Sequence, residues 1–384
     1  MAAVHSENTV LAGVVPGNEV TPSSAGEVAE VLRATTGTVV PVGAGTKTGW
    51  AALPASCDLL LRTTALNRVV EHVPGDLVVV AEAGVALATL QGQLAEHNQM
   101  LALDPPEPGA TLGGIVSANA SGPRRLRYGT ARDLLIGVTV VLADGTTARS
   151  GGKVVKNVAG YDLGKLYTGA HGALGVVVST TWRLHPLPAA AGAVVVPVPD
   201  AASAGRLAIR VARSTLTPTA VELRWDGSAG ELVLLFENIQ ASVDAQSAAA
   251  IELLGGGESV AGPPSWFGSR PTGEMVLRIA YVPAALPQVL SALPAGSSGT
   301  ASACTGVAYM SVPTDGDPGE DLAALRAAIA PHDGSAVVIA APDDVRSGID
   351  HWGPTPDSFG LMTRVKDQFD PGRRLSPGRL LGGL

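Results

Sequence analysis

Cysteine is almost missing from this chain of 384 residues, which has Cys57 and Cys304 and no others. Two cysteines cannot build a framework of several disulfides, and they are too few for a cysteine-rich structural zinc site. Such low cysteine usage is typical of a reducing compartment. The sequence therefore predicts a cytoplasmic protein without a metal centre.

Long apolar runs and basic blocks are also missing. No stretch of 18 residues is both uncharged and strongly apolar, so we expect no transmembrane helix. The first residues, MAAVHSENTV, lack the basic and apolar regions of a signal peptide. The net charge is −8, and no more than two lysines or arginines follow one another, which argues against nucleic-acid binding. Association with a membrane through a partner stays open.

Aromatic residues are scarce, with five Trp, five Tyr and four Phe, but apolar residues still make up 46% of the chain. That is enough for sizeable cores, and the length allows roughly two or three domains. Glycine and proline number 47 and 28. They interrupt runs of Val, Leu and Ile rather than forming repeats, so we expect a folded chain with many tight turns.

The first half of the chain alternates apolar runs with glycine-rich turns. Residues 23–34 are expected to form a helix with Ser23 or Ser24 as its N-cap, and residues 86–97 a second helix. The Asp144-Gly145 pair between two β-branched runs predicts a hairpin. Other apolar runs predict strands within 38–50, 57–64, 76–84 and 173–188.

Residues 190–341 have a different pattern, in which strands alternate with helices. This pattern is typical of a separate α+β domain with an antiparallel sheet. Strands are expected within 193–199, 220–225, 231–238, 274–282, 306–313 and 336–342, and helices within 200–213, 241–254, 285–293 and 318–330. We therefore predict domain boundaries after residue 188 and after residue 345.

Three glycine-rich segments are candidates for chemistry. The first, Gly43 to Gly49 (G-A-G-T-K-T-G), matches neither a dinucleotide fingerprint nor a Walker A loop. Glycines after a strand nevertheless let successive N–H groups converge on an anion such as a pyrophosphate. An ordinary glycine turn is the other interpretation.

The second segment runs from Gly109 to Gly122 and combines small residues with short hydroxyl side chains. Small residues allow a flat ligand to approach the backbone closely. The third, residues 151–177, mixes lysines with Tyr161 and Asp162 and ends in a glycine-flanked strand. For the second segment, the alternative is a glycine-rich loop that binds no ligand. For the third, it is a solvated helix start followed by a core strand.

Taken together, the ordered motifs P-V-G-A-G-T-K, D-P-P-E with A-T-L-G-G, V-L-A-D-G, V-K-N-V-A-G-Y-D-L and G-A-L-G-V-V resemble a known domain. It is the FAD-binding domain of the vanillyl-alcohol oxidase/PCMH flavoproteins. Within this family the sequence is most similar to the FAD-binding subunits of bacterial glycolate oxidases. The resemblance covers residues 20–188. The ending F-D-P…S-P-G-R also agrees, with Ser376 where the family usually has asparagine.

The resemblance implies an α+β fold class. A PCMH-type two-subdomain FAD-binding fold would span residues 1–188, and an α+β cap or substrate domain with an antiparallel sheet would span 189–345. The tail 346–384 would return to the FAD domain. The FAD ligands implied are Gly43, Ala44, Gly45, Thr46 and Lys47 at the pyrophosphate, Gly109, Thr111, Gly113, Gly114, Ser121 and Gly122 along the pyrophosphate and flavin, and Gly172, Gly175 and Val177 near the adenosine.

The resemblance also bears on FAD attachment and on catalysis. Relatives that attach FAD covalently use a His or Cys near these loops, and Cys57 and His97 lie outside the matching positions, so non-covalent FAD is expected. Catalytic relatives carry a clustered H-x-G-D-G-N-x-H motif, which this sequence lacks. Arg270, in W-F-G-S-R, is a candidate anion clamp because a similar element occurs in the family's substrate domain. An arginine on a solvated loop is the alternative.

Three hypotheses follow. In the first, the chain is the FAD-binding subunit of a glycolate oxidase-like complex that oxidises a small 2-hydroxy acid. The resemblance implies that a homologous flavoprotein subunit and an iron–sulfur subunit are its partners. In the second, the chain is a self-sufficient FAD-dependent dehydrogenase of the D-lactate type with a non-metal base. In the third, it is a flavin-free assembly subunit, against which the intact glycine loops argue.

Overall fold

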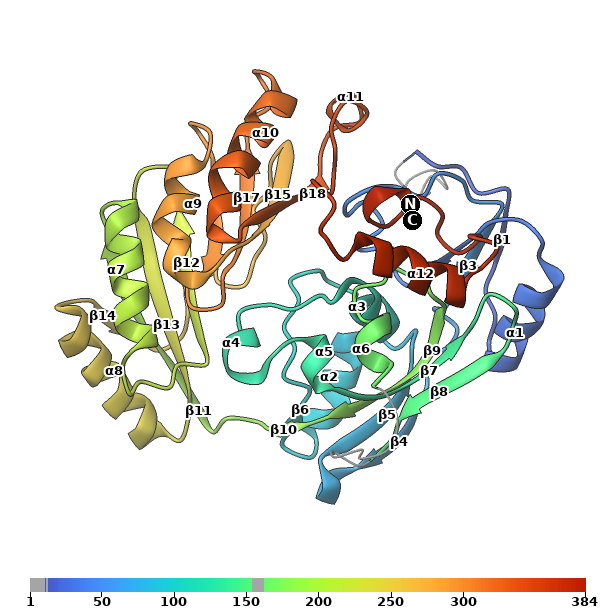
Figure 1. The fold of residues 1–384 in the computed structure, drawn as a ribbon. Helices are drawn as coiled ribbons and strands as arrows, with labels where there is room; N and C mark the ends of the chain where they lie inside the picture. Colours follow the sequence, from blue (N-terminus) through green and yellow to red (C-terminus); the bar gives the residue numbers. More distant parts are fainter. Residues whose placement is uncertain (1–10, 12, 154–161) are drawn as a thin grey trace, which may run out of the picture. The chain divides into compact units, whose positions relative to one another are not determined.

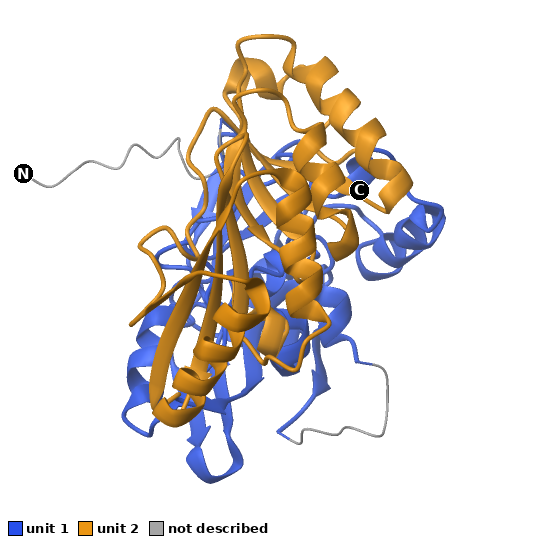
Figure 2. Cartoon of the chain, turned by 90° about the vertical axis from the view of Figure 1, so that its left-hand side faces the viewer, with its two compact units in different colours: residues 1–121, 130–187, 354–384 blue, residues 122–129, 188–353 orange. Residues whose placement is uncertain are grey.

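The computed structural model describes residues 11, 13–153 and 162–384. The N-terminal residues discussed above, and residues 154–161 of the third glycine-rich segment with Tyr161, lie outside the described part. The chain divides into two compact units, coloured separately in Figure 2. Unit 1 comprises residues 1–121, 130–187 and 354–384, and unit 2 comprises 122–129 and 188–353. The divisions at 187/188 and 353/354 lie near the predicted boundaries, whereas the sequence pattern gave no sign that 122–129 belongs to unit 2.

Unit 1 contains a small parallel sheet and a larger antiparallel sheet. The parallel sheet has the strand order β1-β3-β2, with β1 Asn18–Val20, β2 Val39–Val42 and β3 Leu59–Arg62. The antiparallel sheet has the order β4-β5-β9-β7-β8, with β4 Val69–Val73, β5 Val78–Glu82, β7 Leu135–Val141, β8 Thr147–Gly151 and β9 Val176–Arg183. A short pair joins β6 Gln99–Met100 to β10 His185–Pro186.

Short helices connect these strands, and a further helix lies near the C-terminus of the chain (Figure 1). They are α1 Ala25–Ala34, α2 Leu87–Ala95, α3 Leu112–Ala118, α5 Ala131–Leu134, α6 Gly164–Tyr167 and α12 Phe359–Phe369. Single 3₁₀ turns lie at Pro74–Asp76 and Leu381–Gly383. The predicted hairpin is confirmed: β7 and β8 pair across Asp144-Gly145, and Gly145 takes a φ of +78° that suits glycine.

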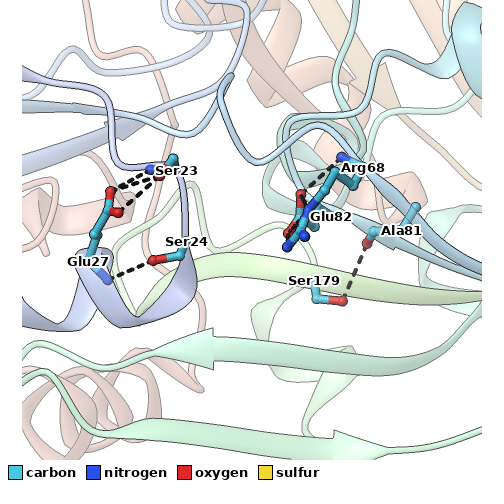
Figure 3. Close-up of polar contacts among 7 residues, drawn as sticks. All are labelled: Ser23, Ser24, Glu27, Arg68, Ala81, Glu82 and Ser179. Atoms are coloured by element: carbon cyan, nitrogen blue, oxygen red, sulfur yellow. Dashed lines mark hydrogen bonds and ion pairs between the residues drawn. The ribbon is translucent and has the colours of Figure 1, made fainter.

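Local side-chain contacts fix two elements of unit 1, both drawn in Figure 3. Ser24 caps α1 by accepting a hydrogen bond from the Glu27 amide at 3.2 Å, as the sequence predicts. The Glu82 carboxylate at the end of β5 is buried and accepts bonds from the Arg68 guanidinium at 2.7 Å and from the Arg68 amide at 2.9 Å. This pair links Arg68, just before β4, to the end of the neighbouring strand β5.

Unit 2 is built on a single antiparallel sheet with its longer helices on one face. The strand order is β14-β11-β13-β12-β16-β17-β15-β18. The strands are β11 Ala190–Val198, β12 Ala220–Trp225, β13 Gly230–Asn238, β14 Glu258–Val260, β15 Met275–Ala280, β16 Ser298–Ser302, β17 Val307–Val312 and β18 Ser335–Ala340. The α+β composition and the antiparallel sheet predicted for this region are therefore confirmed.

The longer helices of unit 2 pack on the face of the sheet that carries alternate apolar residues such as Leu223, Leu277 and Met310. They are α7 Ala201–Ala212, α8 Gln240–Leu254, α9 Leu286–Ala292 and α10 Pro318–Ile329, with 3₁₀ turns at Pro283–Ala285 and Ala330–His332. The short helix α4 Arg125–Tyr128 lies at the other face, and α11 Asp343–Arg346 follows β18. Residues between these apolar positions, including Glu222, Arg278 and Tyr309, point to the opposite face because side chains alternate along a strand. That face is polar.

Candidate functional site

Unit 1 contains a cavity of about 770 Å³, part of it open to solvent. Stretches that are far apart in the sequence form its walls: β2 with the glycine loop after it, parts of 111–118 and 171–177, and the C-terminal turn at Ser376 and Arg379. Most of the lining residues are glycine, alanine, serine or threonine, so a ligand can lie close to the backbone.

The glycine loop follows directly from the buried strand β2. A side chain at Gly43 would put its Cβ 2.1 Å from the Thr111 hydroxyl oxygen, so this position has room for hydrogen alone. Gly45 takes a φ of +77°, a conformation that side-chain-bearing residues adopt at a cost. The loop therefore brings the backbone at residue 43 against the second predicted segment, at Thr111.

Lys47 supplies a buried positive charge to the cavity wall. Its side chain is 6% exposed, and Nζ lies 3.3 Å from the Glu107 carboxylate and 3.0 Å from the Thr46 hydroxyl. Arg379 fixes the same loop from the C-terminal side, because its guanidinium donates to the carbonyls of Lys47 at 2.9 Å and Ala52 at 2.5 Å. The Glu107 carboxylate offsets the charge of Lys47, so the Arg379 guanidinium and the open backbone loop add to what this wall offers an anionic ligand.

The segment from His171 to Val177 forms another wall through its backbone. His171, Gly172 and Gly175 have φ values of +48°, +78° and +158°. A Cβ at Gly172 would lie 3.1 Å from the Pro41 ring and 3.3 Å from the Ser376 hydroxyl. These close approaches explain why the segment is rich in glycine.

Most of the residues predicted to hold a cofactor lie together on this cavity. The lining includes Gly43, Ala44, Gly45, Thr46, Lys47, Thr111, Gly113, Gly114, Gly172, Gly175 and Val177. Gly109, Ser121 and Gly122 lie outside the lining, and any contact of theirs with a ligand stays a prediction. Ser376 and Arg379 were missed as lining residues, although their S-P-G-R motif was recognisable in the sequence.

Arg270 belongs to unit 2 and lies over an aromatic ring. Its Cζ is 3.9 Å from the centroid of Tyr309. Arg278 is the direct cross-strand partner of Tyr309 and shares its face of the sheet. Burial alone would raise the pKa of Tyr309, but the positive charges of Arg270, Arg125 and Arg278 outweigh it and lower the pKa to about 7. The result is an ionisable phenol within a cationic cluster.

Among the residues that the structure describes, no group of three or more His, Cys, Asp or Glu side chains is arranged to hold a metal ion. No helix among the same residues is long and apolar enough to cross a membrane. Cys57 is buried in a small apolar cluster with Val40 and Leu60 and is not part of the cavity lining. Burial raises the pKa of its thiol to about 11.

Residues 16–151, which contain the glycine loop and the Thr111 segment, match the family model described as an FAD-binding domain. The chain carries a PCMH-type FAD-binding domain. Its cofactor is FAD. The chain is 40% identical over 124 residues to the glycolate oxidase subunit GlcE of Escherichia coli, which covers 32% of this chain and 35% of that protein.

Other relatives extend the comparison. The chain is 33% identical over 261 residues to a D-lactate dehydrogenase of Archaeoglobus fulgidus, covering 61% of this chain and 58% of that protein. The matched region therefore spans less than two thirds of the length of these curated relatives. A solved structure of alkyldihydroxyacetonephosphate synthase matches with a TM-score of 0.69 and 16% identity, covering 94% of this chain and 76% of that one. This likeness bears on the fold alone.

The cavity fits FAD on its own structural features. FAD is long and flat and carries a diphosphate, so it needs exposed backbone, cations and close approach. The FAD-binding domain offers a glycine loop at 43–45, the Lys47 ammonium, and glycines at 172 and 175. A buried hydroxyl at Ser376, without a hydrogen-bond partner among the described residues, also lies on the lining.

Proposed function

We propose that this FAD-dependent oxidoreductase takes part in the oxidation of a small 2-hydroxy acid, glycolate to glyoxylate, as the FAD-binding subunit of a glycolate oxidase-like complex. The observation that carries the proposal is the FAD-binding domain with its cavity, in a chain whose 40% identical relative is named a glycolate oxidase subunit. Its partners would be a homologous flavoprotein subunit and an iron–sulfur subunit. Non-covalent FAD would lie against the glycine loop and residues 172–177.

When bound, FAD supplies the hydride acceptor for oxidation of the substrate carbon that bears the hydroxyl group. The residues of this chain would hold and orient it. Lys47 would place its ammonium near the diphosphate, and Glu107, at 3.3 Å, would keep that ammonium in position. Gly43 and Gly45 would expose backbone N–H groups to the same phosphates.

A self-sufficient D-lactate-type dehydrogenase is the second candidate, and the cationic cluster of unit 2 favours it. Arg270 would be the anion clamp for a substrate carboxylate, because guanidinium groups bind carboxylates through paired hydrogen bonds. The match to the archaeal D-lactate dehydrogenase, which extends over 61% of this chain, supports the same alternative. The flavin-free hypothesis is not retained, because the domain is an FAD-binding one.

Steady-state assays separate the two candidates. The purified chain with FAD is tested for dye reduction with glycolate and with D-lactate, alone and after mixing with co-purified partner subunits. For the complex subunit we expect turnover only with the partners. Turnover at ordinary enzyme rates by the chain alone would instead establish the self-sufficient dehydrogenase, and bound FAD without turnover in any mixture would contradict both.

The tyrosine of unit 2 gives a pH-dependent prediction. In the Tyr309→Phe variant, the absorbance change near 295 nm that accompanies tyrosine ionisation around pH 7 should disappear. The pKa of Tyr309 is about 7, below the usual value of about 10. Ionised Tyr309 therefore stabilises the fold fully above pH 10, and this stabilisation is lost as the pH falls through 7.

Urea unfolding checks the same point: between pH 7 and 10 the free energy of unfolding should rise more in wild type than in Tyr309→Phe. Tyr281→Phe is the matched control, because Tyr281 is buried in the same unit and burial raises its pKa. A transition near pH 7 that survives in Tyr309→Phe, or vanishes in Tyr281→Phe, would assign the ionisation to another group.

A further inference from the structure

The C-terminal turn around Ser376 lies on the FAD cavity but outside residues 16–151, which the FAD-binding family model matches. Ser376 is 1% exposed, and its hydroxyl has no hydrogen-bond partner among the described residues. Buried hydroxyl groups are almost always hydrogen-bonded, because leaving one unpaired forfeits its solvation. An unpaired hydroxyl on the wall of a ligand cavity is therefore positioned for a group that the ligand brings.

The backbone holds this hydroxyl in place. Ser376 has a φ of +44°, a left-handed conformation that is uncommon for serine. Its amide donates to the Val39 carbonyl at 2.9 Å, and its carbonyl accepts from the Arg379 amide at 3.2 Å. The preceding amide, of Leu375, donates to the buried Asp370 carboxylate at 2.8 Å. Strained residues that their surroundings hold on both sides are frequent at ligand sites.

Gly172 lies directly beside the Ser376 hydroxyl on the cavity wall. Gly172 faces Ser376, and a Cβ at Gly172 would lie 3.3 Å from the Ser376 oxygen. Gly172 also takes a φ of +78°. Because residue 172 is a glycine, it has no side chain that could lie between the Ser376 oxygen and the cavity. Both residues line the same cavity.

We propose that Ser376 is an FAD ligand whose hydroxyl group hydrogen-bonds to the bound cofactor. FAD offers phosphate, ribityl and ring acceptors, and a serine hydroxyl can donate to any of them. The C-terminal turn thus completes a site whose other walls come from the first half of the chain. Three residues later, the Arg379 guanidinium donates hydrogen bonds to the carbonyls of Lys47 and Ala52. These bonds link the C-terminal turn to the predicted diphosphate end of the site.

The test separates a ligand from a merely structural residue. Ser376→Gly removes the hydroxyl but favours the left-handed backbone. The full-length variant, freed of FAD, should therefore resist urea at least as well as wild type. Its Kd for FAD, measured by fluorescence titration, should rise about tenfold, as expected for one lost hydrogen bond. Ser376→Ala should lose the same FAD affinity and also some resistance to urea.

A matched control and a second ligand sharpen the result. Ser179→Ala removes a half-buried hydroxyl from β9 outside the cavity lining and should leave the FAD Kd unchanged. Titration with ADP locates the contact: a tenfold loss for ADP as well places it on the ADP half, and a loss for FAD alone places it on the flavin half. An FAD Kd for Ser376→Gly within twofold of wild type, with the fold intact, would overturn the proposal.

Discussion

Replacing Asp370 by asparagine should lower the free energy of unfolding by about 3–5 kcal/mol, the usual loss when one partner of a buried ion pair is removed. The Lys366 and Asp370 side chains are 1% and 0% exposed, and Lys366 Nζ lies 2.7 Å from the carboxylate. Burial lowers the pKa of Lys366, and the charge of Asp370 opposes that shift. Asparagine keeps the shape but leaves the ammonium without its counter-ion. Urea unfolding of the full chain measures the change.

The same helix offers a matched control. Asp367 forms an ion pair with Arg373 at 2.8 Å, but both side chains are about half exposed. Exposed pairs contribute little because water screens them, so Asp367→Asn should cost less than about 1 kcal/mol. Equal losses for the two variants would show that burial of the Lys366–Asp370 pair has no special weight.

The Lys366–Asp370 pair should contribute strongly to stability because it connects distant parts of the chain. Lys366 also donates to the carbonyls of Ala173 and Leu375, each at 2.8 Å. These residues immediately adjoin Gly172 and Ser376 on the cavity wall. One buried ammonium therefore holds two walls of the FAD site together, although they are separated by some 200 positions in the sequence. Loss of Asp370 should loosen both walls, so FAD should also bind less tightly to the variant.

Elements set by local patterns were predictable from the sequence. Alternating apolar runs such as E-L-V-L-L-F-E-N encode strands with one buried face, and β13 lies where that run predicts it. Asp144-Gly145 encodes a tight turn, and Ser24 an N-cap, through their own side chains and backbone preferences. The glycine motifs likewise identified the FAD-binding domain.

Features that depend on distant neighbours were not predictable. β16, with the sequence S-G-T-A-S, has no strand pattern and becomes a strand because β12 and β17 pair with it on either side. Tyr309 lies beside Arg278 because of the register of their strands. It lies beside Arg270 because of the path of the loop that carries this arginine. Ser376 meets Gly172 only because the C-terminal turn packs against β2.

Gly45→Glu should have the largest effect on cofactor binding. In the proposed site, Gly45 belongs to the loop that faces the FAD diphosphate. A carboxylate about 5 Å from a phosphate charge, at an effective dielectric of about 20, repels it by about 3 kcal/mol. That corresponds to at least about a 100-fold rise in Kd. The φ of +77° at this position adds backbone strain for any side chain. Fluorescence titration of the full chain with FAD measures the loss.

Two variants divide this effect into its physical parts. Gly45→Ala adds the backbone strain without the charge, so its FAD Kd should rise far less than that of Gly45→Glu. Gly92→Glu adds the same charge on α2, at an exposed position where a Cβ meets no atom within 4 Å, and should leave FAD binding unchanged. Because repulsion by charge falls with salt, the gap between Gly45→Glu and Gly45→Ala should narrow as ionic strength rises. Full FAD occupancy in Gly45→Glu would mean that the diphosphate does not lie at this loop.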